Sequence, residues 1–297
     1  MAEVAAQQPI VVPDPSDTVA ARIIRIAGKL PVNLFLAAIG LVWLVPTIGL
    51  FLSSLLAPND FNSKGWWQII SKPSVATWAN YSNLWNSTDI PHSLVTTAEI
   101  AIGGTVFPIL VAALAGYAFA WLEFPGRDWL FVVVIGLLVV PLQMALIPMF
   151  SLYNKLGIFD TVISLVLFHT AFGLPFAIFL LRNFFIGIPK DILESARIDG
   201  ASEVRIFSRL ILPLGLPAIA SLAIFQFLWT WNDLLVALTF ARNTQPVTVA
   251  IYTNLRQFGS NIDIIAPASF LSLVIPLAVF FAFQRYFVQG LLAGSVK

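Results

Sequence analysis

The sequence predicts an all-α membrane protein with six transmembrane helices. Of its 297 residues, 59% are hydrophobic and only 10% are charged, and the mean hydropathy is +0.89. Ordinary soluble domains carry about 25% charged residues, so this chain belongs in a lipid bilayer. A helix that crosses the roughly 30 Å hydrocarbon layer needs about 20 apolar residues. Six stretches meet this requirement: Val32–Leu56, Ser93–Leu122, Leu130–Leu152, Val162–Leu181, Leu214–Leu238 and Pro267–Phe287.

The length of these stretches excludes two other interpretations. The strands of a membrane barrel show short alternating segments, whereas these stretches are long and continuously apolar. The first stretch is too long for the apolar core of a signal peptide, and no small-residue cleavage site follows it. We therefore expect it to remain in the mature chain as a transmembrane helix.

Basic residues are concentrated on one side of the predicted membrane. With the N-terminus in the cytoplasm, the inner basic residues are Arg22, Arg25, Lys29, Arg127, Arg182, Lys190, Arg197, Arg205, Arg209, Arg285 and Lys297. The outer ones are fewer: Lys64, Lys72, Lys155, Arg242 and Arg256. The positive-inside rule favours this orientation. We therefore expect cytoplasmic tails at residues 1–30 and 290–297 around a transmembrane domain at residues 31–289.

An aromatic loop is predicted on the outer side, at residues 58–91. It holds several rings among Asn and Ser, namely Trp66, Trp67, Trp78, Tyr81 and Trp85. Such rings can stack on sugars, but Trp and Tyr are also enriched wherever a chain meets lipid headgroups. Both interpretations stay open, and the second is favoured.

A charged cytoplasmic segment is predicted at residues 183–213. Eight of the chain's 16 basic and 15 acidic residues lie in the range Lys190–Arg209. Pro189 can begin a short helix there, and Gly200 can end it. We therefore expect a helix, a break and a second helix before the fifth transmembrane stretch.

Residue spacing in this segment predicts its contacts. Glu194 and Arg197 are one helical turn apart and can form an ion pair. In the second helix, Val204, Phe207 and Ile211 share an apolar face, and Arg205 and Arg209 share a basic face. By periodicity alone this is an amphipathic helix on the cytoplasmic membrane surface.

The order of residues in this segment resembles the EAA loop of permeases in ATP-driven importers. That loop has Glu-Ala-Ala, three residues, Gly, nine residues and Ile-x-Leu-Pro. Here Glu194–Ala196 is followed at these spacings by Gly200 and Leu210–Pro213, with Ser195 and Leu210 as mild departures. In the family, the loop forms a coupling helix that docks into the ATP-hydrolysing subunit. The resemblance implies a coupling role for Glu194, Ser195, Ala196, Asp199, Gly200, Leu212 and Pro213.

Other segments extend the resemblance to the carbohydrate-uptake branch, the maltose-type permeases. These segments are Ala115–Arg127, Val139–Pro148, Leu180–Lys190, Trp231–Leu235 and Gln284–Lys297. His92, Trp121 and Ala237 depart from the residues that are common there, which leaves the substrate open. The resemblance implies the type I ABC importer permease fold, with six transmembrane helices and a cytoplasmic coupling helix.

The resemblance also implies partners and a location. Such permeases work in a prokaryotic cell membrane with a sister permease, two ATP-binding subunits and an extracytoplasmic solute-binding protein that delivers sugar. ATP and Mg would bind to the ATPase subunits, and this chain has no G-x-x-x-x-G-K-[ST] motif of its own. We expect a non-catalytic subunit with no cofactor and no nucleic-acid partner. Glycerol-phosphate or a polyol is the alternative cargo.

Candidate substrate-path residues lie in two of the predicted spans. Glu99 is an acid within the second span, and such a residue is a functional candidate by default, although a structural hydrogen bond explains it equally well. A group of polar and aromatic residues lies near the outer end of the fifth span: Trp229, Trp231, Asn232 and Asp233. These side chains could line a sugar path. An aromatic belt at a helix end is the competing interpretation.

The last residues admit two interpretations. By composition, residues 290–297 form a frayed tail. The resemblance to maltose-type permeases instead implies that Gly290, Gly294 and Lys297 belong to a segment that reaches between the ATPase subunits.

Two other classes of protein fit the sequence poorly. A secondary transporter would carry internal repeats and ligands for a coupling ion near the membrane midplane, whereas Glu99 is solitary. A membrane enzyme or metal site would need clustered groups, but His92 and His169 are far apart in the sequence and lack ligand spacing. The chain has no Cys, which excludes disulfides and thiolate chemistry.

Overall fold

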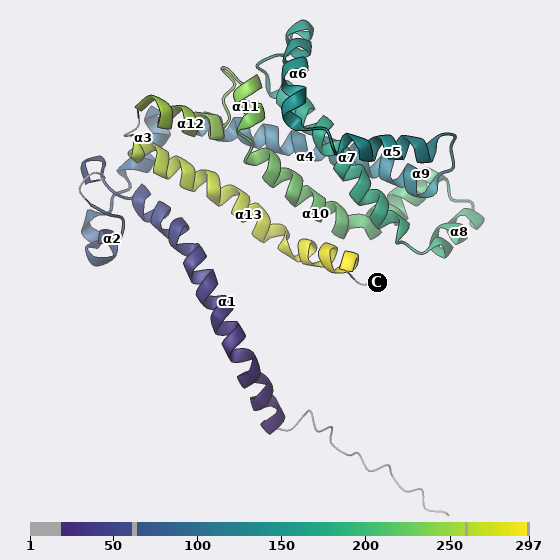
Figure 1. Cartoon of the computed structure of the whole chain (residues 1–297), viewed down its shortest axis with the longest axis horizontal. Coiled ribbons are helices and arrows are strands. Elements are labelled where there is room, and N and C mark those ends of the chain that lie inside the picture. The colour runs from purple at the N-terminus through teal and green to yellow at the C-terminus, as the bar shows by residue number, and fades with distance from the viewer. Residues whose placement is uncertain (1–18, 61–63, 259–260, 296–297) are drawn as a thin grey trace, which may run out of the picture. The chain divides into compact units, whose positions relative to one another are not determined.

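The described residues form a helical membrane domain, which confirms the predicted all-α fold class. The computed structural model describes residues 19–60, 64–258 and 261–295 (Figure 1). The helices are α1 (Val19–Ser54), α2 (Gln68–Ser71), α3 (Ala79–Ser87), α4 (Ile90–Trp121), α5 (Arg127–Leu137), α6 (Leu142–Leu156), α7 (Val162–Ile186), α8 (Lys190–Ile198), α9 (Glu203–Ile206), α10 (Leu212–Trp231), α11 (Leu235–Phe240), α12 (Val247–Phe258) and α13 (Ile262–Ser295). The chain divides into two units, Met1–Leu50 and Phe51–Lys297.

The first unit consists mainly of α1, which begins at Val19, inside the stretch predicted as a tail at residues 1–30. The sequence from Val19 to Leu30 contains Ala, Arg, Lys and Leu, which are strong helix formers, and Pro31 is the first proline of the helix. The helix therefore extends about three and a half turns beyond the predicted membrane stretch. Residues 1–18 of the predicted tail lie outside the described residues.

The second unit is built around α4, which packs most extensively against α7 and also contacts α10. On the far side of α10 lies α13, which also contacts α3 and α12. The face of α4 that meets α7 carries small residues such as Ala112 and Ala113, both buried. Small side chains let membrane helices approach closely, which increases van der Waals contact between them.

The third predicted span, Leu130–Leu152, is not one continuous helix. It is divided into α5 and α6, which meet at a bend of 98°. The break falls before Pro141, which has no N–H to donate and disfavours helical backbone at Val140. In the described residues, five helical segments are long and apolar enough to cross a membrane, and this bent pair provides a sixth if it is one span.

The fifth predicted span, Leu214–Leu238, ends earlier than expected, because α10 stops at Trp231. Asn232 caps that end by donating its side-chain amide to the Leu228 carbonyl at 2.8 Å. The remaining predicted residues enter the separate helix α11. The helix that crosses the membrane instead extends in the other direction, and runs without interruption from Glu203 to Trp231.

The predicted outer loop at residues 58–91 is folded into short helices. Its chain is tied to the end of α1 by Asn80, whose amide donates to the carbonyls of Ser54 at 2.9 Å and Leu56 at 2.6 Å. The rings of Trp67, Trp78 and Trp85 are exposed. Residues 61–63 lie outside the described residues.

Candidate functional site

The charged segment folds into a helical hairpin at one end of α7. We call α8, the turn Asp199–Ser202 and α9 the charged hairpin. α8 follows α7 after a short connection that ends at Pro189, the residue before the first helical position. α9 continues through a π turn at Phe207–Ile211 into α10. The hairpin is therefore connected to a transmembrane helix on each side.

The turn of the hairpin depends on Gly200, as the sequence predicts. The Gly200 amide donates to the Arg197 carbonyl and the Ala201 amide to the Ala196 carbonyl, both at 3.0 Å. These two bonds are the Schellman pattern that ends many helices. Gly200 has φ of 78°, a left-handed conformation that Gly adopts without the steric cost of a Cβ atom. The direction of α9 relative to α8 is thus fixed by one residue.

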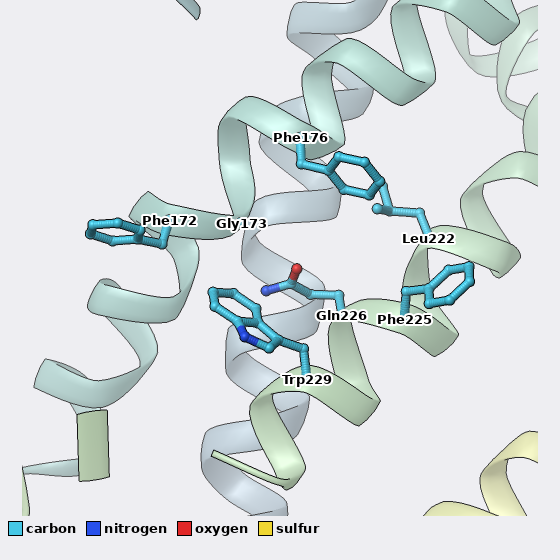
Figure 2. A pocket seen from close by; sticks show the side chains of 7 residues that line it. All are labelled: Phe172, Gly173, Phe176, Leu222, Phe225, Gln226 and Trp229. Carbon is cyan, nitrogen blue, oxygen red and sulfur yellow. The ribbon is translucent and has the colours of Figure 1, made fainter. Parts of the chain in front are cut away.

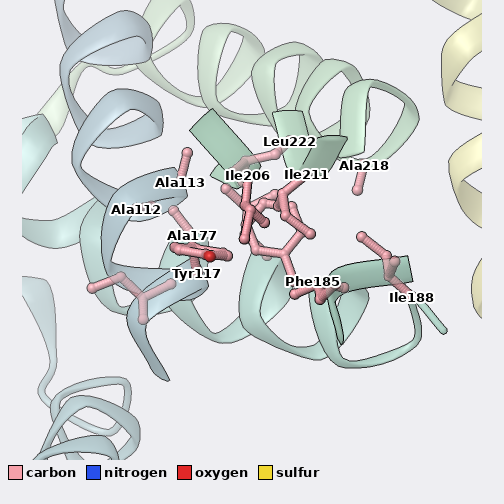
Figure 3. Close-up of a cluster of buried hydrophobic side chains, with 13 residues drawn as sticks. Ala112, Ala113, Tyr117, Ala177, Phe185, Ile188, Ile206, Ile211, Ala218 and Leu222 are labelled. Atoms are coloured by element: carbon pink, nitrogen blue, oxygen red, sulfur yellow. The ribbon is translucent and has the colours of Figure 1, made fainter. Parts of the chain in front are cut away.

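The hairpin is rooted in the apolar core of the second unit. Leu193, Ile206 and Ile211 are fully buried. They pack in one cluster with Tyr117 of α4 and Phe185 of α7, as Figure 3 shows for the labelled members. Fully burying one such aliphatic side chain contributes about 1.5–3 kcal/mol, so these three hold the hairpin and the π turn that follows it against the membrane helices.

The ion pairs of the hairpin differ from the predicted one. Glu194 pairs with Lys190 at 2.7 Å and not with Arg197. Arg197 instead pairs with Glu203 across the turn, at 2.9 Å between Nε and Oε1. The hydrogen bond to Glu203 raises the pKa of Arg197 above its ordinary value. Glu194 prefers Lys190, which lies one turn earlier at the i,i+4 spacing. Arg197 prefers Glu203, because the chain turns back at Gly200 and brings the two side chains together.

The tip of the hairpin exposes both charged and apolar side chains. Ile198 is 85% exposed and Val204 is 77% exposed, on either side of the turn. The prediction that Val204, Phe207 and Ile211 share one apolar face is therefore wrong, because Val204 is exposed and Ile211 is fully buried. The π turn adds a residue between them, so that Ile206 faces the core instead. Of the predicted coupling residues, Glu194, Ser195, Asp199, Gly200 and Pro213 are exposed, and Ala196 and Leu212 are half-buried.

Pro213 does not separate the hairpin from the next span. It lies in the first turn of α10, where its missing N–H would otherwise pair with the carbonyl of Arg209. The π turn precedes it, and the Leu212 amide reaches back five residues to the Phe207 carbonyl. The wider turn lets the helix continue through the proline.

Three of the predicted substrate-path residues organise the end of α10. Trp231 is buried, and its ring N–H donates to the Ser272 carbonyl on α13 at 3.0 Å. Asp233 accepts from the amides of Val236 at 3.2 Å and Ala237 at 2.9 Å, which caps α11. With Asn232 as the cap of α10, all three side chains serve helix ends and helix packing.

Trp229, the fourth residue of this group, borders a groove between α7 and α10. The groove has a volume of about 350 Å³ and is lined by Phe172, Gly173, Phe176, Leu222, Phe225, Gln226 and Trp229 (Figure 2). The side-chain amide of Gln226 is buried at its base and donates to the Gly104 carbonyl of α4 at 3.0 Å. A Cβ atom on Gly173 would lie 2.6 Å from that amide nitrogen, so a larger residue there would force the Gln226 side chain to shift. A polar residue within an apolar stretch is the signal that could have identified Gln226 from the sequence.

Comparison with known proteins identifies the family. The sequence model of the family described as "Binding-protein-dependent transport system inner membrane component" matches residues 49–293 of this chain. The chain belongs to this family. It is therefore a membrane-spanning permease of a binding-protein-dependent ABC transporter, as the EAA-like pattern predicts.

Individual relatives agree with this assignment. The permease is 46% identical to the osmoprotective compounds uptake permease GgtD of Synechocystis sp., over 91% of this chain and 92% of that one. It is 52% identical to the alpha-glucoside transport permease AglG of Rhizobium meliloti, over 76% of this chain and 61% of that one. A bacterial ABC transporter that imports the polysaccharide alginate has the same fold, with a TM-score of 0.72 at 19% identity over 92% of this chain and all of that one. The type I importer permease fold is confirmed.

Glu99 lies apart from the groove. It is on the exposed side of α4 with Val95 and Ile102, whereas Gly104 on another face of the same helix meets Gln226. The permease therefore does not bring Glu99 and Trp229 into one site.

The predicted tail contact falls partly within α13. Gly290 and Gly294 belong to this helix, which extends to Ser295, so their backbone is helical and not a loose tail. Lys297 lies outside the described residues.

A second polar structure lies at the other end of α7 from the hairpin. The Asp160 carboxylate accepts from the amides of Arg242 at 2.7 Å, Asn243 at 2.9 Å and Thr244 at 3.1 Å. We call this arrangement the Asp160 clamp. Desolvation raises the pKa of Asp160, but the hydrogen bonds from Thr244, Asn243 and Arg242 outweigh it, and the pKa lies below its ordinary value.

Proposed function

We propose that this permease forms one side of a path for sugar and that the charged hairpin couples it to an ATP-hydrolysing subunit. One observation carries the proposal: the hairpin has an exposed tip and a fully buried root. An exposed tip with Ile198, Val204 and adjacent charges can enter a cleft on a partner, because buried apolar anchors ringed by polar contacts provide most of the binding energy in interfaces. The buried root can transfer movement of the tip to α4 and α7.

The sugar cargo is supported by the groove and by the relatives. Aromatic walls with a small number of polar groups are typical of small-molecule sites, and the groove of about 350 Å³ has this lining. Trp229 and Gln226 are the residues we expect to face the cargo. AglG is named for alpha-glucosides, which supports a glucoside. An osmoprotective compound such as a polyol is the second candidate, because GgtD is named for that class.

The proposed assembly contains this chain, a sister permease, two ATPase subunits and an extracytoplasmic binding protein. ATP and Mg would bind to the ATPase subunits, and this chain would have no catalytic role. We expect both termini in the cytoplasm, and residues 290–297 in contact with the ATPase subunits. The excess of basic residues in the predicted cytoplasmic segments supports this orientation.

Reconstitution tests the cargo and the coupling together. The permease is expressed with the products of neighbouring genes, purified as a complex and placed in liposomes. ATP hydrolysis and uptake of radiolabelled trehalose, sucrose and sorbitol are measured with each sugar-loaded binding protein. We expect one sugar to stimulate hydrolysis at least several-fold and to accumulate. Stimulation by sorbitol alone would favour the polyol, and uptake that needs no ATP would contradict the proposal.

Substitutions at the tip test the docking surface. Ile198→Asp and Val204→Asp should each reduce the amount of ATPase subunit that co-purifies with the permease by about tenfold, because a charge enters an apolar contact. Ile198→Leu is the matched control and should retain the subunit. Normal co-purification of both Asp variants would place the docking surface elsewhere.

A further inference from the structure

We propose that Tyr117, Arg197 and Glu203 form a latch that makes α4 move with the charged hairpin. These three are positioning residues: they would not touch ATP or sugar, but would set how much hairpin movement reaches the membrane helices. We call them the Glu203 latch. The inference rests on the proposed coupling function of the hairpin.

The latch joins two elements that are far apart in the sequence. The Tyr117 hydroxyl, in the penultimate turn of α4, donates to Oε2 of Glu203 at the start of α9. Arg197, in the last turn of α8, donates to Glu203 through Nε at 2.9 Å and Nη2 at 3.4 Å. The same Nη2 atom lies 3.4 Å from the Trp121 carbonyl, at the end of α4. Glu203 thus receives hydrogen bonds from α4 and from the other arm of the hairpin.

The second ion pair of the hairpin lacks this geometry. Lys190 and Glu194 are neighbours within α8, and their side chains are 69% and 47% exposed. A pair inside one helix cannot connect the hairpin to another element. The side chains of Arg197 and Glu203 are less exposed, at 35% and 43%, and Glu203 has a bond outside the hairpin. Charged hydrogen bonds of this kind are shorter and stronger than neutral ones.

Tyr117 also belongs to the apolar root. Its ring is buried and lies 5.3 Å from that of Phe207 in the π turn. Figure 3 shows the ring among the labelled side chains of the cluster. The polar contact at the hydroxyl and the apolar contact at the ring therefore hold the same side chain from two sides.

α4 is suited to carry the movement across the membrane. It has 32 residues and so spans about 48 Å, the full width of a bilayer. Trp121 at its end donates its ring N–H to the Phe185 carbonyl of α7 at 3.0 Å. Packed helices and hydrogen-bonded networks carry coupling between distant sites when their elements can adopt two arrangements, and we expect α4 to adopt one in each nucleotide state. The latch provides this link at the end of α4 nearest the hairpin.

The test compares sugar transported per ATP hydrolysed in the reconstituted full complex. Glu203→Gln and Tyr117→Phe keep the size of each side chain but weaken the latch. We expect each to lower the sugar-to-ATP ratio at least fivefold, while the ATPase subunits still co-purify. Matched controls are Tyr81→Phe, which removes a tyrosine hydroxyl that lies 2.7 Å from Ser54, and Asp128→Asn, which removes an exposed ion pair with Arg127. Both controls should leave the ratio within about twofold of the wild type.

Charge reversal gives a readout that a merely structural role would not produce. Arg197→Glu and Glu203→Arg should each lower the ratio. The double variant should stay low, because it restores the ion pair but offers Tyr117 no carboxylate at residue 203 and the Trp121 carbonyl no donor at residue 197. An unchanged ratio in Glu203→Gln and Tyr117→Phe would overturn the latch. Loss of the ATPase subunit in Glu203→Gln would also overturn it, since Glu203 would then belong to the docking surface.

A second measurement separates the latch from the proposed cargo. The chain has no cysteine, so a single Val95→Cys on the exposed side of α4 reports on this helix. Its rate of thiol labelling should differ at least threefold between the nucleotide-free and the ATP-trapped complex. In Glu203→Gln that difference should disappear, whichever sugar is carried. If the wild-type complex moves no sugar but keeps this difference in labelling rate, only the proposed cargo is refuted. If Glu203→Gln keeps the difference in labelling rate, the latch is refuted.

Discussion

The two ends of α7 are held by different chemistry. At the hairpin end, side chains form the contacts: an apolar root and the partly exposed pair of Arg197 and Glu203. At the other end, the Asp160 carboxylate binds three consecutive backbone amides of a loop, and Thr244 returns a hydrogen bond from its hydroxyl to the Asp160 carbonyl at 2.8 Å. Side-chain pairs can exchange partners by rotamer changes, whereas a backbone amide moves only with its loop. We infer that the hairpin end is built for movement and the clamp end for rigidity.

Chemical labelling tests whether these two ends lie on opposite sides of the membrane. Ser202→Cys in the hairpin turn and Arg242→Cys beside the clamp are both exposed positions in a chain without cysteine. An impermeant thiol reagent applied to intact cells should label Arg242→Cys almost completely and Ser202→Cys hardly at all. The reverse pattern would invert the topology, and equal labelling would show that the hairpin is accessible from outside.

Substitution of Gly200 should disrupt the charged hairpin more than any other single change. A Cβ atom there would meet nothing within 4 Å, so the expected effect of a substitution comes from the left-handed backbone and not from a clash. Gly200→Val should reduce sugar uptake more than tenfold, because a β-branched residue costs more than the 1–2 kcal/mol typical of this conformation.

Gly200→Asn is the matched control, since asparagine tolerates the left-handed region. It should retain most of the uptake and should insert into the membrane as well as the valine variant. Full uptake by Gly200→Val would show that the direction of the turn does not matter for coupling.

Substitutions in the Asp160 clamp should lower the stability of the permease and leave the sugar-to-ATP ratio unchanged. Asp160→Ala removes the acceptor of three amides and also places alanine at a φ of 60°. We expect a loss of about 1–2 kcal/mol in the free energy of unfolding, since water can replace part of the hydrogen bonding. Asp160→Asn should lose less, and thermal unfolding of the purified protein measures both. A reduced sugar-to-ATP ratio at unchanged stability would contradict this division of roles.

The pH dependence of the clamp should be the smallest of these effects. Its stabilisation is fully present above the pKa of aspartate in an unfolded chain, about 3.9, and is lost as the pH falls through the lower folded value. The stability difference between wild type and Asp160→Asn should therefore be the same at pH 8 and pH 5. A difference that narrows within that range would show that the carboxylate is not held in its charged form.

Local rules predict the parts of this fold in which the residues decide their own conformation. Continuous apolar stretches predict the spans, and Gly200 predicts the turn, because a left-handed position needs glycine whatever surrounds it. The break before Pro141 also follows from a local rule, because proline disfavours helical backbone at the residue before it. Prediction by length alone misses this break, because the apolar stretch Leu130–Leu152 is long enough for one continuous span. The early end of α10 is similar, since Asn232 and Asp233 are ordinary capping residues.

The contacts between distant residues could not be predicted in the same way. The sequence offers Glu194 and Arg197 as a pair, and only the folded turn brings Glu203 to Arg197. Nothing near Tyr117 indicates that its hydroxyl meets Glu203, which is 86 residues away. Likewise, the amides that Asp160 binds are 82 to 84 residues further along the chain. Hydrogen bonds between residues that only the tertiary fold brings together leave no periodic pattern in the sequence.

The π turn at Phe207–Ile211 fixes the rotational phase of the hairpin. Each residue of a helix turns the chain by about 100°, so the extra residue in this turn decides which side of α9 faces the bundle. If the same residues formed an ordinary α-helix without the π turn, α9 would be rotated by about 100° relative to α10. Ile206 would then turn away from Phe185, and Glu203 away from Tyr117. A single inserted residue thus sets the alignment between the charged hairpin and the transmembrane helix α10.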